Sequence, residues 1–345
     1  MEAIDLRSDT VTKPSPAMRE AMYRAEVGDD GYYDDHTVNR LQEIVAERVG
    51  KEDSLLMPSG CMANLVGLLT NCTRQGEVIL GDSTDMYIWE CGAMSVVGGL
   101  YPHPLPNQLN GTIGLGEIEA AIRCEDVHFP RTQLICIENT NNVCGGVPLT
   151  SEYTASVSAL AKRHKLRLYL DGARVFNSAV AQGIDVRELT KDVDSLQFCL
   201  SKGLGCPVGS MLCGSKDFVY EARRNRKMLG GQMRQAGIIA AAGIVAMEQM
   251  VDRLAEDHQN AHVLAADLSE IKGLTIKPEN VQTNIIYLQL TGRDKMHEEL
   301  VARLDKEGVK VIVMGAWIRA VTHYGITEQD VKAAAAVIGR VVGAM

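Results

Sequence analysis

Short apolar runs alternate with longer helical patterns between about residues 40 and 215, and this alternation constrains the fold more than any other feature. The predicted strands are 54–57, 77–80, 133–137, 167–170, 195–199 and 209–213. The predicted helices among them include 37–49, 62–70, 151–164 and 218–228. Parallel strands need long crossover connections, so this order favours a mainly parallel sheet covered by helices on both faces. The predicted fold class is α/β.

The pattern changes after residue 236. Two long helices are predicted at 236–250 and 251–268, followed by strands at 273–276, 284–290, 309–313 and 317–322 and a helix at 295–306. This βαββ order predicts a second, smaller domain of the α+β class. We therefore expect an N-terminal segment and a large domain over residues 1–250, and a small C-terminal domain over residues 251–345.

Composition restricts the partners and the compartment. The chain has 345 residues and a formal net charge of −9, without a run of basic residues. Nucleic acid is therefore not an expected partner, because neutralising phosphates requires clustered Lys and Arg. The nine cysteines form no C-x-x-C pair, which gives a metal or redox site no support. With no apolar signal core and no apolar run of transmembrane length, we expect a cytoplasmic protein that does not enter a membrane.

Polar residues that could bind or react with a ligand follow three of the predicted strands. Ser59 and Gly60 open a helix after the strand 54–57, Asp171 follows the strand 167–170, and Lys202 follows the strand 195–199. Ligands of open α/β sheets bind at the carboxyl ends of the strands. The turn at Gly60 offers backbone N–H groups and a helix N-terminus to a phosphate. These groups are therefore expected to meet in one site.

Lys202 is unusual because a lysine at the end of a buried strand is costly to desolvate. Burial lowers the pKa of a lysine, which helps if the amine must attack an aldehyde. Three glycines follow it, Gly203, Gly205 and Gly209, and would let the backbone approach a ligand closely. The alternative is a surface lysine that ends the strand, since most lysines are exposed.

A phosphate cradle, a carboxylate and a lysine together match the needs of pyridoxal 5′-phosphate. Lys202 would meet the aldehyde, Asp171 the ring nitrogen, and Arg174 the 3′-oxygen. Taken alone, Asp171 could be a helix N-cap and Ser59-Gly60 an ordinary turn. Their joint order and spacing favour the cofactor. The glycines after Lys202 do not have the nicotinamide-binding spacing, and the chain has neither a Walker motif nor a Gly-x-Ser-x-Gly motif.

With these motifs and others, the chain resembles the low-specificity L-threonine aldolase family of the beta-eliminating lyase superfamily. The matching segments are 4–12, 27–30, 58–60, 138–140, 170–177, 199–205, 226–228, 233–235 and 319–323, so the resemblance runs nearly end to end. It implies a fold type I, aspartate-aminotransferase-like pyridoxal-phosphate enzyme with a mainly parallel seven-stranded sheet. It also implies a homo-oligomer, a dimer or a dimer of dimers, with shared active sites.

The resemblance assigns roles to the matching positions. Lys202 would carry pyridoxal phosphate as a Schiff base, Asp171 would pair with its ring nitrogen, and Arg174 would lie by its 3′-oxygen. The remaining assignments are phosphate binding by Ser59, Gly60 and the amide of Cys61, phosphate binding across a subunit boundary by Arg234, substrate binding by Ser8, Tyr32, Arg174 and Arg319, and a place on the substrate side for His128. No metal is implied.

Three departures from the family pattern stand out. Asp85 takes the place of the histidine that stacks on the cofactor ring, and Asn141 replaces a second histidine. The acidic loop 28–35 has Tyr33 where a glycine is usual, and His36 follows where a proline is usual. An aspartate cannot stack as an aromatic ring does, and beside the cofactor it would need a partner or a raised pKa. Asp85 is therefore counted with both the catalytic and the cofactor-binding residues.

The implied activity is retro-aldol cleavage of L-threonine or L-allo-threonine to glycine and an aldehyde. His128, Asp85 or a water would accept the proton of the β-hydroxyl group. The alternatives are an amino-acid racemase, such as an alanine racemase, on the same scaffold, a β-eliminating lyase, or a relative that binds the cofactor without catalysis. Retention of Lys202, Asp171, Arg174 and Arg319 disfavours the last of these. The preference between threo and allo substrates stays open.

Overall fold

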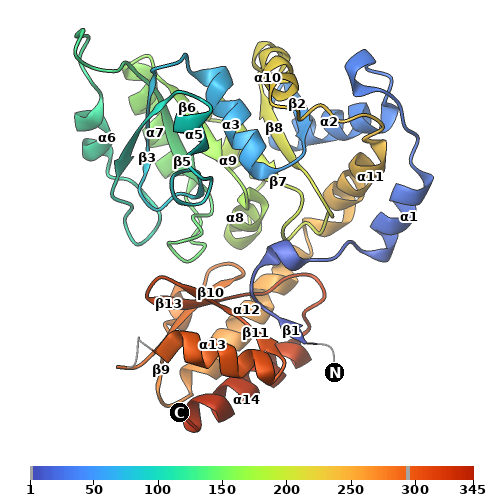
Figure 1. Cartoon of the computed structure of the whole chain (residues 1–345), viewed down its shortest axis with the longest axis vertical. Coiled ribbons are helices and arrows are strands. Elements are labelled where there is room, and N and C mark those ends of the chain that lie inside the picture. Colours follow the sequence, from blue (N-terminus) through green and yellow to red (C-terminus); the bar gives the residue numbers. More distant parts are fainter. Residues whose placement is uncertain (1–2, 293–295) are drawn as a thin grey trace.

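A computed structural model describes residues 3–292 and 296–345 and places the chain in two lobes (Figure 1). The upper lobe contains a seven-stranded sheet of order β2-β8-β7-β6-β5-β3-β4. Its strands are β2 (Asp53–Met57), β3 (Glu77–Gly81), β4 (Tyr101–Leu105), β5 (Thr132–Glu138), β6 (Arg167–Asp171), β7 (Ser195–Cys199) and β8 (Ser210–Gly214). The strand β8 is antiparallel to both of its neighbours, β2 and β7, and all other pairs in this sheet are parallel. The predicted α/β class with a mainly parallel sheet is thus confirmed.

Alternate residues of these strands supply two separate apolar layers. In β5, Ile135 and Ile137 pack into one buried cluster, whereas Leu134 and Cys136 pack into another on the opposite face. Successive side chains of a strand point to opposite faces, and a sheet covered on both sides is apolar on both. This explains why the strands appear in the sequence as continuous apolar runs.

All six strands predicted for this sheet exist, and β4 was missed. Its sequence, Tyr-Pro-His-Pro-Leu, contains Pro102 and Pro104, which cannot donate backbone hydrogen bonds. The strand is tolerated because it lies at the edge of the sheet, where only one side must pair.

Helices cover the sheet, and several of them are capped by short polar side chains. They are α1 (Pro16–Arg24), α2 (His36–Val49), α3 (Gly60–Asn71), α4 (Asp85–Ile88), α5 (Ala93–Val96), α6 (Leu115–Ala121), α7 (Ser151–Arg163), α8 (Val175–Gln182), α9 (Val186–Thr190), α10 (Lys216–Met228) and α11 (Gly237–Val245). The Ser59 hydroxyl accepts the N–H of Met62 at the start of α3, and Ser215 caps α10 in the same way. These caps fix where the helices begin relative to the strand ends.

The lower lobe is built on a four-stranded antiparallel sheet of order β12-β13-β10-β9. Its elements are α12 (Leu254–Ser269), β9 (Leu274–Thr275), β10 (Ile285–Leu290), α13 (His297–Lys306), β12 (Ile312–Met314), β13 (Trp317–Val321) and α14 (Glu328–Gly343). The strand predicted at 309–313 is divided between β12 and the separate β11 (Val309–Lys310). The final helix α14 was not predicted, and Lys295, the predicted first residue of α13, lies outside the described residues.

The N-terminal strand β1 (Ile4–Asp5) pairs with β11, and Leu6 is buried in the apolar core of the lower lobe. The chain therefore passes from the lower lobe to the upper one before the large sheet begins (Figure 1). The chain returns through α11, a π-helical segment (Ala246–Met250), a short turn at 251–253 and α12. The domain boundary near residue 250 falls in this stretch and stays a prediction.

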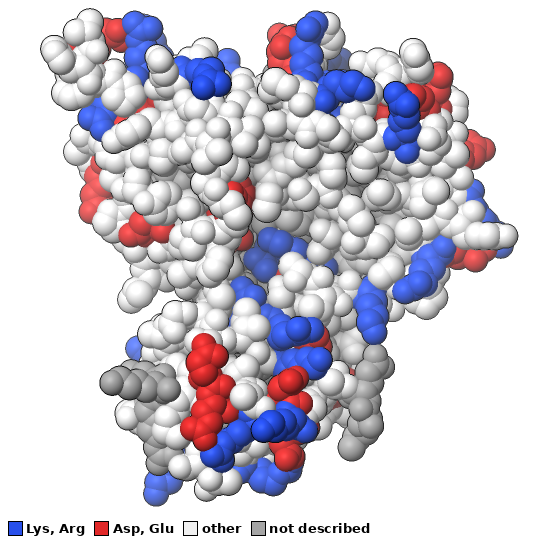
Figure 2. Space-filling model, viewed as in Figure 1, with Lys and Arg blue, Asp and Glu red and all other residues white. Residues whose placement is uncertain are grey.

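Charges of both signs are interspersed on the face in Figure 2, and Lys and Arg side chains gather where the two lobes meet. Among residues 3–292 and 296–345, every helix is too short or too polar to cross a bilayer.

Candidate active site

Asp171 and Lys202 lie at the carboxyl ends of the neighbouring parallel strands β6 and β7. Asp171 is the last residue of β6, opposite Gln197 of β7, and Lys202 follows β7 in a turn that returns to β8. Gly205 and Gly209 have φ values of +78° and +111° in this turn. Both glycines are therefore required by the path of the backbone, whereas the sequence suggested that they served close approach to a ligand.

The electrostatic setting of Lys202 differs from the expectation. Burial lowers the pKa of Lys202, but interactions with the acidic groups Cys199, Asp85 and Asp9 act in the opposite direction, and the pKa is raised overall. The prediction of a depressed pKa was wrong because it considered burial and left out the acidic neighbours. In the protein alone, Lys202 is an ammonium group.

Asp171 is almost fully buried and is held by donors on both of its oxygens. Oδ1 accepts the side-chain amide of Gln197 at 2.6 Å and the backbone N–H of Ala173 at 3.1 Å, and Oδ2 accepts the Asn64 amide at 2.8 Å. Burial raises the pKa of Asp171, with a further contribution from Asp85, while Lys202 opposes the shift. A buried carboxylate with a raised pKa is a strong acceptor for a proton on a ring nitrogen.

Asn64 and Glu90 belong to the same cluster and were missed in the sequence. The Asn64 amide also donates to Oε1 of Glu90 at 2.8 Å, and its oxygen accepts the Tyr169 hydroxyl at 3.0 Å. A Cβ atom at Gly67 would lie 2.6 Å from the Tyr169 ring, so this glycine lets the tyrosine lie against α3. Burial and the neighbouring Asp171 raise the pKa of Glu90 to about 8.

Arg174 is neutralised by Asp9, another residue that the sequence did not single out. The two side chains form a buried bidentate pair, with Nε to Oδ2 and Nη2 to Oδ1 both at 2.7 Å. Burial opposes charge on both groups, but their mutual attraction raises the pKa of Arg174 and lowers that of Asp9. The Asn284 amide also reaches Asp9, at 3.4 Å. Asp9 thus brings the N-terminal segment to the carboxyl end of the sheet.

Arg319 of β13 faces this cluster from the lower lobe. Its Nη1 donates to Oδ1 of Asn142 at 2.7 Å, and its Nη2 donates to the carbonyl of Arg7 at 3.0 Å, next to Ser8. Its Nε is buried without a hydrogen-bond partner among the described residues. Burial and nearby Arg174 lower the pKa of Arg319, so an anion placed between the two guanidinium groups would be favoured. Arg319 thus contacts the residue that precedes Ser8, and the substrate-binding roles of Ser8 and Arg319 stay predictions.

Asp85 is tied to Arg319 through one residue. Its Oδ1 accepts the side-chain amide of Asn142 at 3.3 Å, and its backbone N–H donates to Glu138 at 2.7 Å. The other oxygen of Glu138 accepts the backbone N–H of Asn142 at 2.9 Å. Burial and Asp85 raise the pKa of Glu138. Asn142 is thus the hydrogen-bond partner of the Asp85 side chain, and the Glu138 carboxylate accepts the backbone N–H groups of both residues.

The start of α3 has the form expected of a phosphate cradle. A Cβ atom at Gly60 would lie 2.9 Å from the sulfur of Cys199, so only glycine fits there without a shift. Burial and then Glu90 raise the pKa of the Cys61 thiol to about 11. The thiol is therefore neutral at neutral pH and does not oppose an anion at the helix N-terminus.

Three predicted site residues lie apart from this cluster within one chain. The side chain of His128 is 83% exposed and its Nδ1 lies 2.7 Å from Asp126. Tyr32 is 77% exposed, and the Arg234 side chain is 71% exposed and lies 3.5 Å from Asp29. Their predicted roles stay predictions. The acidic loop itself is anchored, because Asp30 pairs with the buried Arg226 and Asp35 caps α2.

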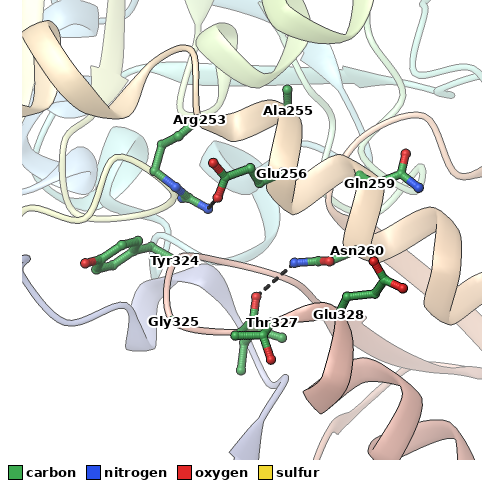
Figure 3. Close-up of a pocket in the computed structure, with 10 residues that line it drawn as sticks. Arg253, Ala255, Glu256, Gln259, Asn260, Tyr324, Gly325, Thr327 and Glu328 are labelled. Carbon is green, nitrogen blue, oxygen red and sulfur yellow. Dashed lines mark hydrogen bonds and ion pairs between the residues drawn. The ribbon is translucent and has the colours of Figure 1, made fainter.

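A surface cavity of about 750 Å³ opens elsewhere, between the start of α12 and the loop before α14. Figure 3 shows Arg253 in it, 3.5 Å from Glu256 and 5.1 Å from the ring centre of Tyr324. None of the residues that line this cavity belongs to the cluster around Lys202 and Asp171. It is therefore separate from the candidate active site.

Comparisons with known proteins agree with this arrangement. The sequence pattern of the beta-eliminating lyase family matches residues 5–291. A low-specificity L-threonine aldolase of Arabidopsis thaliana is 44% identical over 96% of this chain and 94% of its own length. The low specificity L-threonine aldolase of Escherichia coli K12 is 43% identical over 96% of this chain and 97% of its own length.

A solved structure of similar fold is the threonine aldolase of Leishmania major. It is 19% identical, covers 98% of this chain and 99% of its own, and superposes with a TM-score of 0.84. This structural similarity shows the fold, whereas the two relatives that match over nearly the full length show the family. The chain belongs to the beta-eliminating lyase family and, within it, to the group of low-specificity L-threonine aldolases.

Proposed function

We propose that this protein is a pyridoxal-phosphate-dependent aldolase that cleaves L-threonine and L-allo-threonine to glycine and acetaldehyde. The observation that carries the proposal is the meeting of Lys202, Asp171 and the start of α3 at one end of the sheet, with Arg319 facing them from the lower lobe. When bound, pyridoxal phosphate withdraws electrons from the α-carbon of an amino acid. The residues of this chain then decide how the substrate is oriented.

The residues fit this cofactor. The glycine-tight start of α3 suits a phosphate, and the neutral thiol of Cys61 adds no opposing charge. Asp171 supplies a carboxylate for the ring nitrogen, held by the amides of Asn64 and Gln197. Lys202 supplies the amine for the aldehyde. Lys202 is the one lysine among the predicted site residues, so the role of binding the aldehyde falls to it.

The substrate would be held by its carboxylate. Arg319 presents a buried Nε without a partner, and its Nη groups are already oriented by Asn142 and the Arg7 carbonyl. A guanidinium held in this way binds a carboxylate with two parallel hydrogen bonds. Ser8, the residue after Arg7, would donate a further hydrogen bond to the carboxylate.

Within one chain, Asp85 is the proposed base that accepts the proton of the β-hydroxyl group. It stands where the family has a ring-stacking histidine, and among the described residues its side chain has one hydrogen-bond partner, Asn142 at Oδ1. His128, Tyr32 and Arg234 are exposed, and we propose that they act on the site of a second copy in a homo-oligomer.

The test of the activity is to supply L-threonine, L-allo-threonine and L-alanine separately to the purified protein. Glycine with acetaldehyde is the expected product pair from the first two. D-Alanine from L-alanine, without glycine from either threonine, would overturn the aldolase in favour of a racemase. Lys202→Ala should abolish both glycine formation and the visible absorption of the bound cofactor.

The role of Asp85 needs its own comparison. Asp85→Asn preserves the shape and removes the base, so kcat for L-threonine should fall at least about 100-fold if Asp85 takes the proton. Asp217→Asn, an exposed carboxylate in the first turn of α10, is the matched control and should leave kcat unchanged. A kcat for Asp85→Asn within about threefold of the parent would exclude Asp85 as the base.

A further inference from the structure

Glu90 is a titratable group in the cofactor cluster for which neither the motifs nor the proposed function supply a role. It lies just beyond α4, is only partly exposed, and shares the Asn64 amide with Asp171. The amide oxygen of Asn64 is occupied by the Tyr169 hydroxyl. Both hydrogens of the amide therefore point at carboxyl groups, one at Glu90 and one at Asp171.

Two carboxylates that share one amide repel each other, and burial adds to the cost of charge, so the arrangement favours a proton on one of them. Three further hydrogen bonds or charges favour ionisation of Asp171, namely Gln197, the N–H of Ala173 and Lys202. Among the residues that the structure describes, the Asn64 amide is the one hydrogen-bond donor to Glu90, and Asp171 and Asp85 both act against its charge. The proton therefore belongs on Glu90.

The charge of Glu90 would also be felt by an incoming phosphate. Glu90 interacts electrostatically with Cys61, whose backbone N–H lies at the start of α3. It also interacts with the cation Lys202. A negative Glu90 would repel a phosphate dianion at that helix end. A neutral Glu90 would not.

We propose that Glu90 is a positioning residue that must be protonated for the site to hold its cofactor, so that cofactor binding and proton uptake are coupled. The proposal rests on the proposed function only for the identity of the cofactor. Because burial raises the pKa of Glu90 to about 8, its ionisation falls in an accessible range. A cofactor dianion raises that pKa further, and by linkage the affinity falls as Glu90 ionises in the free site.

The test is equilibrium dialysis of the full-length protein against pyridoxal 5′-phosphate at pH 7, 8 and 9. For one group that titrates near pH 8, the dissociation constant should rise about tenfold between pH 7 and pH 9. This added rise should vanish in Glu90→Gln, where a neutral amide replaces the acid. It should persist in Glu90→Asp and in the control Glu125→Gln, whose carboxylate pairs with Arg131 on the surface.

Titration calorimetry at pH 8 in two buffers of different ionisation enthalpy gives a second readout. The parent should take up more protons on binding than Glu90→Gln, and both carry the same contribution from Lys202. Equal pH slopes for the parent and Glu90→Gln would overturn the proposal, as would loss of the cofactor from Glu90→Gln at pH 7. Glycine formation from L-threonine is scored separately, so failure of the aldolase assignment is distinguishable from failure of this proposal.

Discussion

The buried pair between Asp9 and Arg174 provides the sharpest test of the structure. In Asp9→Asn the side chain keeps its shape but loses its charge, and Arg174 stays buried with only 3% of its side chain exposed. Two hydrogen bonds of 2.7 Å lose their charged acceptor, and the guanidinium remains near Arg319 and Lys202. Removing one partner of a buried pair costs about 3–5 kcal/mol, most of it from the uncompensated charge.

The assay is urea unfolding of the cofactor-free protein, followed by fluorescence and circular dichroism. Glu125→Gln is the matched control, because Glu125 and Arg131 form the same bidentate pair with both side chains 73% exposed, and it should change the stability far less than Asp9→Asn does. Adding Arg174→Met to Asp9→Asn should recover part of the lost stability by removing the orphaned charge. An Asp9→Asn cost no larger than that of Glu125→Gln would refute the reasoning.

Three further outcomes are expected. Arg319→Lys loses the planar fork, so the KM for L-threonine should rise about 10- to 100-fold, and an unchanged KM would exclude Arg319 as the carboxylate anchor. Gly67→Ala places a Cβ atom 2.6 Å from the Tyr169 ring and should cost about 1–3 kcal/mol in urea unfolding; no change would mean that the ring moves freely. Arg174 lowers the pKa of Asp9, so the stability from this pair is present above about pH 4 and is lost as the pH falls further. The difference between the parent and Asp9→Asn should therefore shrink below pH 4, and a constant difference down to pH 2 would contradict this.

The fold was largely predictable because its strands are buried on both faces. Continuous apolar runs marked β2, β3, β5, β6, β7 and β8. The edge strand β4 was not predicted because its two prolines argue against a strand. The C-terminal helix α14 was not predicted either. The same strand ends also indicated Asp171 and Lys202, since topology alone brings the carboxyl ends of parallel strands together.

The partners of these residues were not predictable in the same way. Asp9 and Arg174 are 165 positions apart, and Asn64 and Asp171 are 107 positions apart. A polar residue within a helix such as α3, or a carboxylate in an N-terminal segment, carries no local signal of what it will meet. The depressed pKa expected for Lys202 failed in part for the same reason, because two of the acidic groups that raise its pKa, Asp85 and Asp9, come from distant segments.

The sequence by itself determined the order of strands and helices, and therefore the edge of the sheet at which Lys202 and Asp171 meet. Local periodicity and crossover length are properties of neighbouring residues, so they can be read along the chain. Only the tertiary structure decided which charges are compensated: Asp9 neutralises Arg174, Asn142 ties Asp85 to Arg319, and Asn64 joins Glu90 to Asp171. Protonation depends on burial and on charges a few ångströms away, and those distances exist only after the chain has folded.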